Sequence, residues 1–361
     1  MTRKLVTIRR VDQVTKHPNA DSLDLIRIGG WQLVSKLGEF EEGDYCFFFE
    51  IDSILPDVPQ FKFLIEKQGK YYENGLGARL RTIKLRGSVS QGLAMPLAAF
   101  PHAGYNFKDM ESLLGHDFSE DFGVYKYEPP KAGEPGALAG NAAGPWPVGF
   151  PKTDQERIEN CYNEMVNLVN NNGAPLDWVI QEKIEGSSIT MFAQDGVFGV
   201  CSHNVNLKVD ESNLDNRFVK AALKYGWNLI ADLDGNWAIR GELVGPGIQG
   251  NIYGLTEDHI LVFDIWDIDL QRYLDTDEFN EVLGHCDAIG VQVEVVPIVG
   301  YARLLPTLDE VISSADGISA ITHTKREGVV YKSCEVIKDR FGREYVPSFK
   351  AVSRDYLLSE K

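Results

Sequence analysis

The segment from Gln181 to Ser188 has the residue types of a covalent catalytic centre. Lys183 stands at the end of an apolar run, Glu185 follows two residues later, and Gly186 allows the chain to turn sharply. A free lysine amine, with a pKa near ~10.4, is a poor nucleophile at neutral pH unless its surroundings remove the proton. A carboxylate beside it can hold a cation that does so. An isolated pattern of this kind is usually a surface lysine beside a turn. The rest of the sequence must therefore show whether Lys183 is catalytic.

Four further segments with carboxylates, lysines and apolar strand-like residues follow this lysine. They are Arg240–Gly245, Val262–Ile265, Glu327–Lys332 and Ser348–Lys350. Their order and spacing resemble the five-motif signature of the covalent nucleotidyltransferases, the superfamily of ATP-dependent ligases and mRNA capping enzymes. The resemblance covers about residues 150–355, and the combination is far more specific than any single motif.

The resemblance implies a role for each motif. Lys183 is expected to attack the α-phosphate of ATP and form lysyl-AMP, and Lys350 is expected to contact that phosphate. Phe263 is expected to stack on adenine, although outside this motif order it would be interpreted as a core aromatic residue. Carboxylates suit Mg²⁺ or Mn²⁺ because these ions prefer oxygen ligands and keep waters that acidic side chains can hold. The implied metal-holding residues are Glu185, Glu242 and Glu327, and the other implied ATP-binding residues are Glu182, His203, Asn204 and Glu242.

Three positions depart from the family pattern. Glu185 stands where these ligases usually have aspartate, one methylene shorter, and it can still hold a hydrated metal after slight repositioning. His203 lies in the segment where RNA ligases of this kind have an arginine, and a neutral histidine cannot reproduce the two-pronged hydrogen bonding of that side chain. Ser348 replaces the first of two lysines in the last motif. The changes at His203 and Ser348 concern the ribose and phosphate contacts, whereas the change at Glu185 concerns the metal.

The first part of the chain predicts a small closed barrel. Short β-rich runs alternate with turn clusters, as in an OB fold. The segment Lys16–Leu23 resembles the HPxAD signature of tRNA-binding OB domains. An N-terminal barrel joined to a nucleotidyltransferase domain resembles one RNA ligase family, often counted as the fifth. DNA ligases and capping enzymes instead place an OB barrel after the last motif, where 11 residues follow Lys350 in this sequence.

Residues 79–86 contain four basic side chains and no acidic one in an otherwise acidic chain. Such a stretch can line a groove that follows the phosphates of a nucleic acid. A solvated strand face accounts for the same pattern equally well. The predicted RNA-binding residues are Arg79, Arg81, Lys84 and Arg86.

Residues 129–147 contain five prolines and four glycines and predict a linker. The predicted fold class is α+β, with an OB-type β-barrel over residues 1–128, the linker over 129–147, and a nucleotidyltransferase domain over 148–361. The second domain is expected to consist of antiparallel sheets with flanking helices. A helix is predicted to begin with a capping box at Thr153 and to end near Gly173.

The composition limits the class of protein. The chain has 361 residues, of which 43% are hydrophobic and 25% charged, as in ordinary folded proteins. Five scattered cysteines without a CxxC pair favour neither a disulfide framework nor a zinc ribbon. The N-terminus lacks an apolar signal core, and no stretch approaches the roughly 20 apolar residues of a membrane span. We therefore expect a monomeric cytoplasmic protein, or a nuclear one in a eukaryote, that is neither secreted nor bound to a membrane.

The net charge of −17 argues against nonspecific coating of nucleic acid. However, residues 1–128 hold 16 basic and 18 acidic side chains, so nearly all of the excess lies in the second domain. The first domain is therefore electrostatically distinct, which is compatible with a local basic surface for RNA.

Competing interpretations have weaker support. Gly245–Gly250 matches the GxGxxG pattern of dinucleotide-binding domains, but a strand predicted from His259 leaves no room for the helix that this motif needs. Asn251 occupies the lysine position of a P-loop.

A noncatalytic RNA-binding OB protein with a decayed nucleotidyltransferase domain is the remaining alternative. Retention of the lysines and carboxylates of several motifs together argues against decay. The predicted function is that of an ATP-dependent RNA ligase that uses Mg²⁺ or Mn²⁺ and seals 3′-OH and 5′-phosphate RNA ends, as in a nicked duplex. The retained residues are Lys183, Glu242, Glu327 and Lys350.

Overall fold

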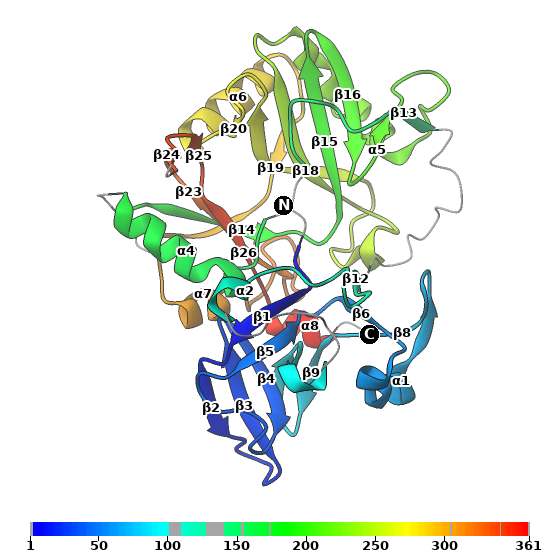
Figure 1. Cartoon of the computed structure of the whole chain (residues 1–361). Coiled ribbons are helices and arrows are strands. Elements are labelled where there is room, and N and C mark those ends of the chain that lie inside the picture. Colours follow the sequence, from blue (N-terminus) through cyan, green and yellow to red (C-terminus); the bar gives the residue numbers. More distant parts are fainter. Residues whose placement is uncertain are drawn as a thin grey trace. The chain divides into compact units, whose positions relative to one another are not determined.

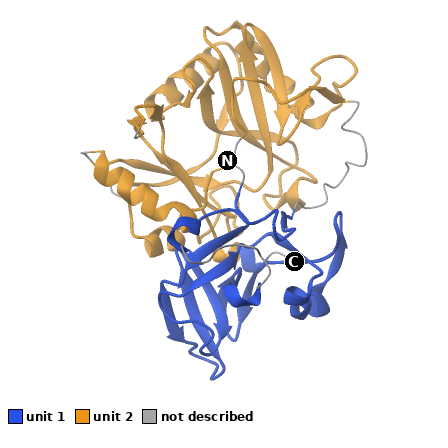
Figure 2. Ribbon diagram, in the orientation of Figure 1, with its two compact units in different colours: residues 1–130, 357–361 blue, residues 131–356 orange. Residues whose placement is uncertain are grey.

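The chain forms two compact units (Figures 1 and 2). The first comprises Met1–Pro130 with Leu357–Lys361, and the second comprises Lys131–Tyr356. The computed structural model describes residues 3–100, 110–127, 141–152, 155–172, 175–303, 305–339 and 341–359. Among these residues, no helix is long and apolar enough to cross a membrane.

Short antiparallel strands build the first unit around an aromatic core. Strand β5 (Tyr45–Phe49) pairs with β1 (Val6–Arg10) on one side and β11 (Leu93–Pro96) on the other. Phe47 and Phe49 of β5 are fully buried and meet other rings edge to face, a favourable geometry for aromatic pairs. The other elements are β2 (Gln13–Lys16), β3 (Leu23–Ile28), β4 (Trp31–Lys36), β6 (Ser53–Pro56), η1 (Pro59–Phe61), α1 (Lys62–Gln68), β7 (Lys70–Tyr72), β8 (Gly75–Arg79), β9 (Thr82–Leu85), β10 (Ser88–Gln91), η2 (Leu97–Ala99), α2 (Met110–Leu113) and β12 (Tyr125–Lys126).

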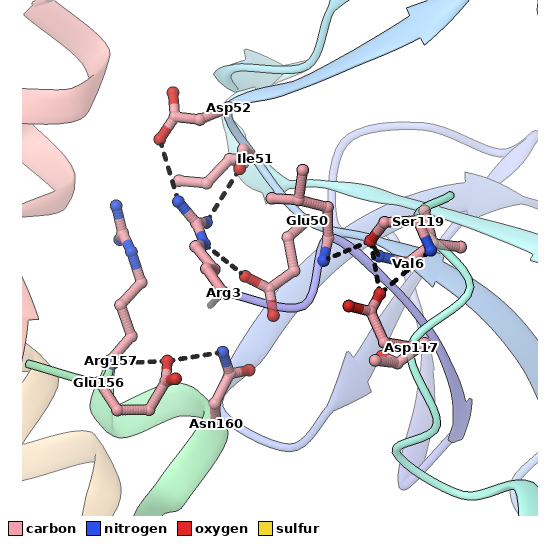
Figure 3. A network of polar contacts seen from close by, with 12 residues as sticks. Arg3, Val6, Glu50, Ile51, Asp52, Asp117, Ser119, Glu156, Arg157 and Asn160 are labelled. Atoms are coloured by element: carbon pink, nitrogen blue, oxygen red, sulfur yellow. Dashed lines mark hydrogen bonds and ion pairs between the residues drawn. The ribbon is translucent and has the colours of Figure 1, made fainter. Parts of the chain in front are cut away.

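The start of the chain is fixed to this unit by polar contacts (Figure 3). The Arg3 guanidinium donates to Glu50 Oε2 and to the Ile51 carbonyl, each at 2.9 Å, and lies 3.5 Å from Asp52 Oδ2. The Ser119 hydroxyl accepts hydrogen bonds from the backbone amides of Leu5 and Val6, at the start of β1. These contacts hold β1 in place for pairing with β5.

An eight-stranded sheet forms the larger part of the second unit. Its strand order is β13-β17-β16-β15-β18-β19-β20, and β21 pairs with β19 in parallel. Apolar side chains of β15, β16, β18 and β19 pack against α5, η3 and α6 in one core. The elements are β13 (Ala142–Gly144), β15 (Ser187–Gln194), β16 (Val197–Ser202), β17 (Asn206–Leu207), α5 (Arg217–Lys224), η3 (Trp227–Asp232), β18 (Trp237–Val244), η4 (Gln249–Asn251), β19 (His259–Asp267), β20 (Arg272–Tyr273), α6 (Thr276–Ala288) and β21 (Glu294–Val295).

A four-stranded antiparallel sheet with the order β22-β14-β23-β26 completes the second unit. Helices α4 and α7 pack on it through a second core that includes Ile158, Met165 and Val311 from the helices and Trp178 and Phe349 from the strands. The elements are α4 (Ile158–Asn171), β14 (Trp178–Lys183), β22 (Ile298–Ala302), α7 (Leu308–Ser314), β23 (Gly328–Ser333), β24 (Ile337–Lys338), β25 (Glu344–Tyr345) and β26 (Ser348–Val352). Helix α8 (Arg354–Ser359) begins in this unit and, from Leu357, belongs to the first.

Two local predictions differ from the structure. Residues 129–140 of the predicted linker lie outside the described residues, but Ala142–Gly144 forms β13 and pairs with β17 rather than acting as a linker. The helix predicted from Thr153 begins at Ile158, with Arg157 as its N-cap and no side-chain cap. Thr153 and Asp154 lie outside the described residues. The GxGxxG segment contains only the short turn η4 before β19, as predicted, and no helix follows these glycines.

Candidate active site

Lys183 and Glu327 face each other at the end of two paired strands. Lys183 is the last residue of β14 and lies opposite Gly328, the first residue of β23. Lys183 Nζ lies 2.6 Å from Glu327 Oε1. A Cβ on Gly328 would lie 2.2 Å from the Ala351 carbonyl oxygen, so only glycine fits after Glu327. The Glu-Gly pair therefore brings a carboxylate to the lysine by close strand packing.

The groups around Lys183 have opposing effects on the pKa of its amine. Burial disfavours the ammonium form, but the carboxylates of Glu327 and Glu242 outweigh it and raise the pKa of Lys183. The buried Arg157 guanidinium acts in the opposite direction and lowers this pKa. Lys183 is therefore held as an ammonium, and its proton must leave before the amine can act as a nucleophile.

Glu242 lies on β18, beside the loop that follows Lys183. Burial, together with a smaller effect of the nearby Glu327 carboxylate, raises the pKa of Glu242 to about 8, although Lys183 lowers it. A Cβ on Gly186 would lie 2.6 Å from the Leu243 carbonyl oxygen and 2.7 Å from Glu242 Cγ. Gly186 has no positive φ, so its role is close approach to β18 rather than the sharp turn predicted from the sequence.

Two tyrosines hold Glu185. Its backbone amide donates to the Tyr253 hydroxyl at 2.7 Å, and the Tyr356 hydroxyl donates to Glu185 Oε1 at 2.5 Å. The carboxylates of Glu327, Glu182 and Glu185 all raise the pKa of Tyr253, after the larger effect of burial. Several carboxylates thus converge on one small region.

This donor set fits a hydrated divalent cation. In the described ranges, no three acidic, histidine or cysteine side chains form a preformed metal cage, and Mg²⁺ characteristically keeps several waters instead. The pKa of Glu242 is raised mainly by burial, and a nearby cation would favour the charged carboxylate. Glu185, Glu242 and Glu327 therefore have the chemistry to hold metal-bound waters, with a positive charge that also favours the neutral lysine amine.

A buried carboxylate and an aromatic ring lie on the apolar side of the site. Glu182 is 1% exposed, and its Oε2 accepts a hydrogen bond from the Ala320 amide at 2.7 Å. Its Oε1 is buried and has no hydrogen-bond partner among the described residues. Phe263 packs against an apolar cluster that includes Ile184 and Val296. A buried carboxylate oxygen without a partner can accept a hydrogen bond from the amino group of a planar base, and an aromatic ring can stack on such a base.

The remaining predicted nucleotide-binding residues lie on strands and turns near these groups. Lys350 lies on β26 opposite Val330 of β23, and its backbone also pairs with Arg157. His203 and Asn204 are exposed in the turn after β16. That turn lies at the end of the sheet where β15 begins, because Ile189 pairs with Ser202. Asn204 Oδ1 accepts a hydrogen bond from Lys152 Nζ at 3.0 Å.

The four basic residues predicted to bind RNA fall into two groups, one with internal contacts and one exposed. Arg79 forms an ion pair with Asp52 at 2.7 Å, and its guanidinium lies 3.9 Å from the centroid of the Tyr127 ring. These internal contacts place Arg79 apart from the other three side chains, which are exposed. The exposed basic group consists of Arg81, Lys84 and Arg86, on and beside the β9–β10 hairpin.

His17 holds this hairpin in place. It is 5% exposed; its Nε2 lies 3.2 Å from the Leu85 carbonyl oxygen, and its Nδ1 accepts a hydrogen bond from the Asn19 amide. The Asn19 side chain in turn donates to the Arg86 carbonyl. The HPxAD-like segment therefore supports the loop that carries Arg86.

Three residues near the site were missed by the sequence analysis. Arg157 precedes α4, Tyr253 follows η4, and Tyr356 lies on α8. None belongs to a recognisable motif, and each reaches the site through tertiary packing. The only available signal was that each is a polar or aromatic residue close in sequence to a motif or a glycine-rich loop.

Both parts of the chain are similar to known proteins. Residues 5–97 match a family profile described as OB-fold domain, and residues 176–352 match one described as RNA ligase. A search of the curated proteins returns no match. Among solved structures, the RNA ligase of Naegleria gruberi as a lysine-to-alanine mutant with ATP and Mn is 34% identical. The match covers 98% of this chain and 98% of that chain, with a TM-score of 0.85.

Two further structures of the Naegleria gruberi RNA ligase are equally similar. A lysine-to-methionine mutant with AMP and Mn is 34% identical, covers 98% of each chain and has a TM-score of 0.85. The ligase with PPi is 34% identical, covers 99% of this chain and 98% of that chain, and has a TM-score of 0.84. An OB-fold domain followed by a ligase domain defines the class of protein. The chain belongs to the RNA ligase family.

Proposed function

We propose that Lys183 attacks the α-phosphorus of ATP, forming a phosphoramide bond to AMP while the bond to pyrophosphate breaks. The AMP then passes to the 5′-phosphate of an RNA strand. Attack by an adjacent 3′-OH forms the phosphodiester bond and releases AMP. The observation that carries this proposal is the 2.6 Å contact between the strand-end amine of Lys183 and Glu327, beside the partly buried Glu242.

The carboxylates supply the conditions for the first step. Glu185, Glu242 and Glu327 would hold Mg²⁺ or Mn²⁺ through its waters, and the metal would supply positive charge at the lysine and the phosphate. Arg157 adds a fixed positive charge that favours the neutral amine. Lys350 would stabilise the negative charge that develops as pyrophosphate leaves. Incubation with labelled ATP tests the step, because a ligase retains covalent AMP, whereas a noncatalytic RNA-binding protein does not.

Adenine selection is assigned to Glu182 and Phe263. The buried Glu182 Oε1 can accept a hydrogen bond from the amino group of adenine, but it would repel the carbonyl oxygen that guanine carries at the same place. Phe263 would stack on the base, while His203 and Asn204 lie on the turn assigned to the ribose and phosphates. ATP is therefore the proposed nucleotide.

A conservative change at Glu182 should alter this choice. Glu182→Gln is expected to weaken the use of ATP by roughly 10- to 150-fold, the cost of a hydrogen bond to a charged group. It should also permit GTP, because the amide nitrogen can donate to guanine. The measurement is the KM for each nucleotide in lysyl-AMP or lysyl-GMP formation, with the exposed Glu281→Gln as a control. An unchanged ATP preference in Glu182→Gln would remove Glu182 from base recognition.

The RNA substrate is proposed to be a nicked duplex with 3′-OH and 5′-phosphate ends, sealed by a monomer. Ribonucleotides should be needed on the 3′-OH side, because the 2′-OH distinguishes RNA from DNA. Equal sealing of an all-DNA nick would contradict this substrate assignment. The first unit would hold the duplex through Arg81, Lys84 and Arg86.

Neutralising the exposed hairpin should separate sealing from adenylylation. Changing Arg81, Lys84 and Arg86 to glutamine is expected to weaken nicked-RNA binding and to reduce its logarithmic salt slope by up to about 2–3, since each phosphate contact contributes roughly 0.9. Lysyl-AMP formation should stay unchanged. Lys62→Gln removes an exposed cation of the same unit, paired with Asp57, and serves as the control. An unchanged salt slope in the triple variant would place the RNA surface elsewhere.

A further inference from the structure

Glu185 is the family departure closest to the nucleophile, and two distant parts of the chain hold it. The Tyr253 hydroxyl accepts from its amide at 2.7 Å, which fixes the backbone. The Tyr356 hydroxyl donates to its Oε1 at 2.5 Å, which fixes the carboxylate. Tyr356 is 171 residues away from Glu185 in sequence and belongs to α8, beyond the last motif. The side-chain contact is therefore a tertiary feature that no motif describes.

Tyr356 is itself connected to the Lys183 partner. The Ser353 amide donates to the Glu327 carbonyl at 2.8 Å, and the Tyr356 amide donates to Ser353 Oγ at 3.1 Å. Ser353 is fully buried, and its hydroxyl donates to Asp316 Oδ1 at 2.6 Å. The backbone of Glu327 and the side chain of Glu185 are thus tied to the same short segment, Ser353–Tyr356.

The length of the side chain makes this tie specific to glutamate. Glutamate has one more rotatable bond than aspartate, so its carboxylate needs an additional restraint to keep one orientation. Aspartate at position 185 would withdraw the carboxylate by about one C–C bond, roughly 1.5 Å. The contact between the carboxylate and the Tyr356 hydroxyl, 2.5 Å with glutamate, would then lengthen beyond the distance at which hydrogen bonds form.

We propose that Tyr356 is a positioning residue that orients Glu185 toward a metal-bound water and so makes glutamate functional where the family pattern has aspartate. The inference rests on the proposed role of Glu185 at the divalent cation. Tyr356 touches neither ATP nor the reacting atoms in this proposal. It acts through the orientation of the carboxylate.

The test uses the full chain and compares metal binding with activity. Tyr356→Phe keeps the ring and removes only the hydroxyl. Binding of Mn²⁺ is measured by the loss of the free Mn²⁺ electron paramagnetic resonance signal relative to the same Mn²⁺ and ATP without protein, in the Lys183→Met background, which is expected to form no lysyl-AMP. We expect Mn²⁺ affinity to fall by about 10-fold or more, as for residues that orient metal-holding groups. With Lys183 present, high Mn²⁺ should restore the rate of lysyl-AMP formation.

A second background makes the test specific. In Glu185→Asp protein, Tyr356→Phe should have no further effect on Mn²⁺ affinity, because the shorter side chain does not reach the hydroxyl. Tyr301→Phe removes a hydroxyl from a tyrosine that is 71% exposed on β22 and should leave Mn²⁺ affinity unchanged. Thermal unfolding of each variant checks that α8 remains packed.

Each outcome has a defined meaning. Unchanged Mn²⁺ affinity in Tyr356→Phe would overturn the positioning role, as would an equal loss in the Glu185 and Glu185→Asp backgrounds. Unchanged Mn²⁺ affinity in Glu185→Ala would instead overturn the metal role of Glu185 on which the inference rests. An unmodified Lys183 in the wild-type protein would overturn the proposed adenylylation, while the Mn²⁺ measurements would still test Tyr356 separately.

Discussion

Replacing Lys183 with methionine is expected to reduce transfer of AMP from ATP to the protein below detection. Methionine keeps most of the length and the apolar stem of lysine but has no nucleophilic amine. The backbone of Lys183 pairs with Gly328, and neither this pairing nor the other hydrogen bonds of β14 depend on the side chain. The fold should therefore persist. The measurement is the intact mass of the protein after incubation with ATP and Mn²⁺.

A matched lysine provides the control for this loss. Lys224→Met removes an exposed lysine on α5 that pairs with Glu257 at the surface, where such a pair contributes little to stability. This variant should still gain one AMP. If Lys183→Met gained one AMP as well, another residue would be the nucleophile, and peptide mapping of the adduct would identify it.

The sequence predicted the elements that carry the chemistry because they combine local signals. An apolar run that ends in Lys183 indicates a strand, and Glu327-Gly328 followed by apolar residues indicates the start of another. The structure contains both, as β14 and β23. The family order of the motifs then linked segments whose separation, 144 residues between Lys183 and Glu327, local patterns cannot bridge.

Contacts that depend on tertiary packing could not be predicted in this way. Tyr356 reaches Glu185 because Ser353 anchors α8 beside Glu327. Arg157 affects Lys183 because the start of α4 lies against β26, where it pairs with Lys350. Nothing in the sequence near either residue indicates its partner. The sequence also suggested a turn at Gly186, whereas the structure requires glycine there because β18 approaches closely.

The basic stretch shows the same limit. Four cations in eight residues predict a charged face, but the sequence does not show which of them have internal partners. Arg79 pairs with Asp52 and lies over Tyr127, 48 residues further along the chain. The exposed positive charge of this stretch therefore comes from Arg81, Lys84 and Arg86. The RNA-binding hypothesis is retained for those three residues, with Arg79 assigned to holding the first unit together.

The second large effect is expected at Glu327. Glu327→Gln keeps the shape and a hydrogen-bond acceptor but removes the charge that pairs with Lys183. A side chain that holds a metal through its waters typically contributes 10- to 100-fold to affinity or activity. We therefore expect lysyl-AMP formation at saturating ATP and Mn²⁺ to fall by about that factor in single-turnover measurements. Loss of all activity in EDTA should accompany it in the wild-type protein.

The pH profile distinguishes this role from general damage. Because the pKa of Lys183 is raised, the neutral amine becomes more abundant as the pH increases, and the wild-type rate should rise with pH. Removing the Glu327 charge leaves burial and Arg157, which lower the pKa of Lys183, opposed by Glu242, whose effect is smaller than that of Glu327. The rate of Glu327→Gln should therefore reach its plateau at a lower pH, although the plateau itself is lower. A variant that is merely misfolded would lose rate without moving the midpoint.

Glu242 provides a second test of the role of lysine deprotonation. The pKa of Glu242 is raised to about 8, mainly by burial, so this carboxyl group gains its charge at a lower pH than Lys183 loses its proton. Glu242→Gln removes that ionisation and also one of the charges that raise the pKa of Lys183. Its midpoint should shift downward less than that of Glu327→Gln, because Glu327 is the closer partner and directly accepts a hydrogen bond from Lys183 Nζ. Equal midpoints in the wild type and both variants would show that lysine deprotonation does not limit AMP transfer, and the proposed division of roles between the two carboxylates would then be wrong.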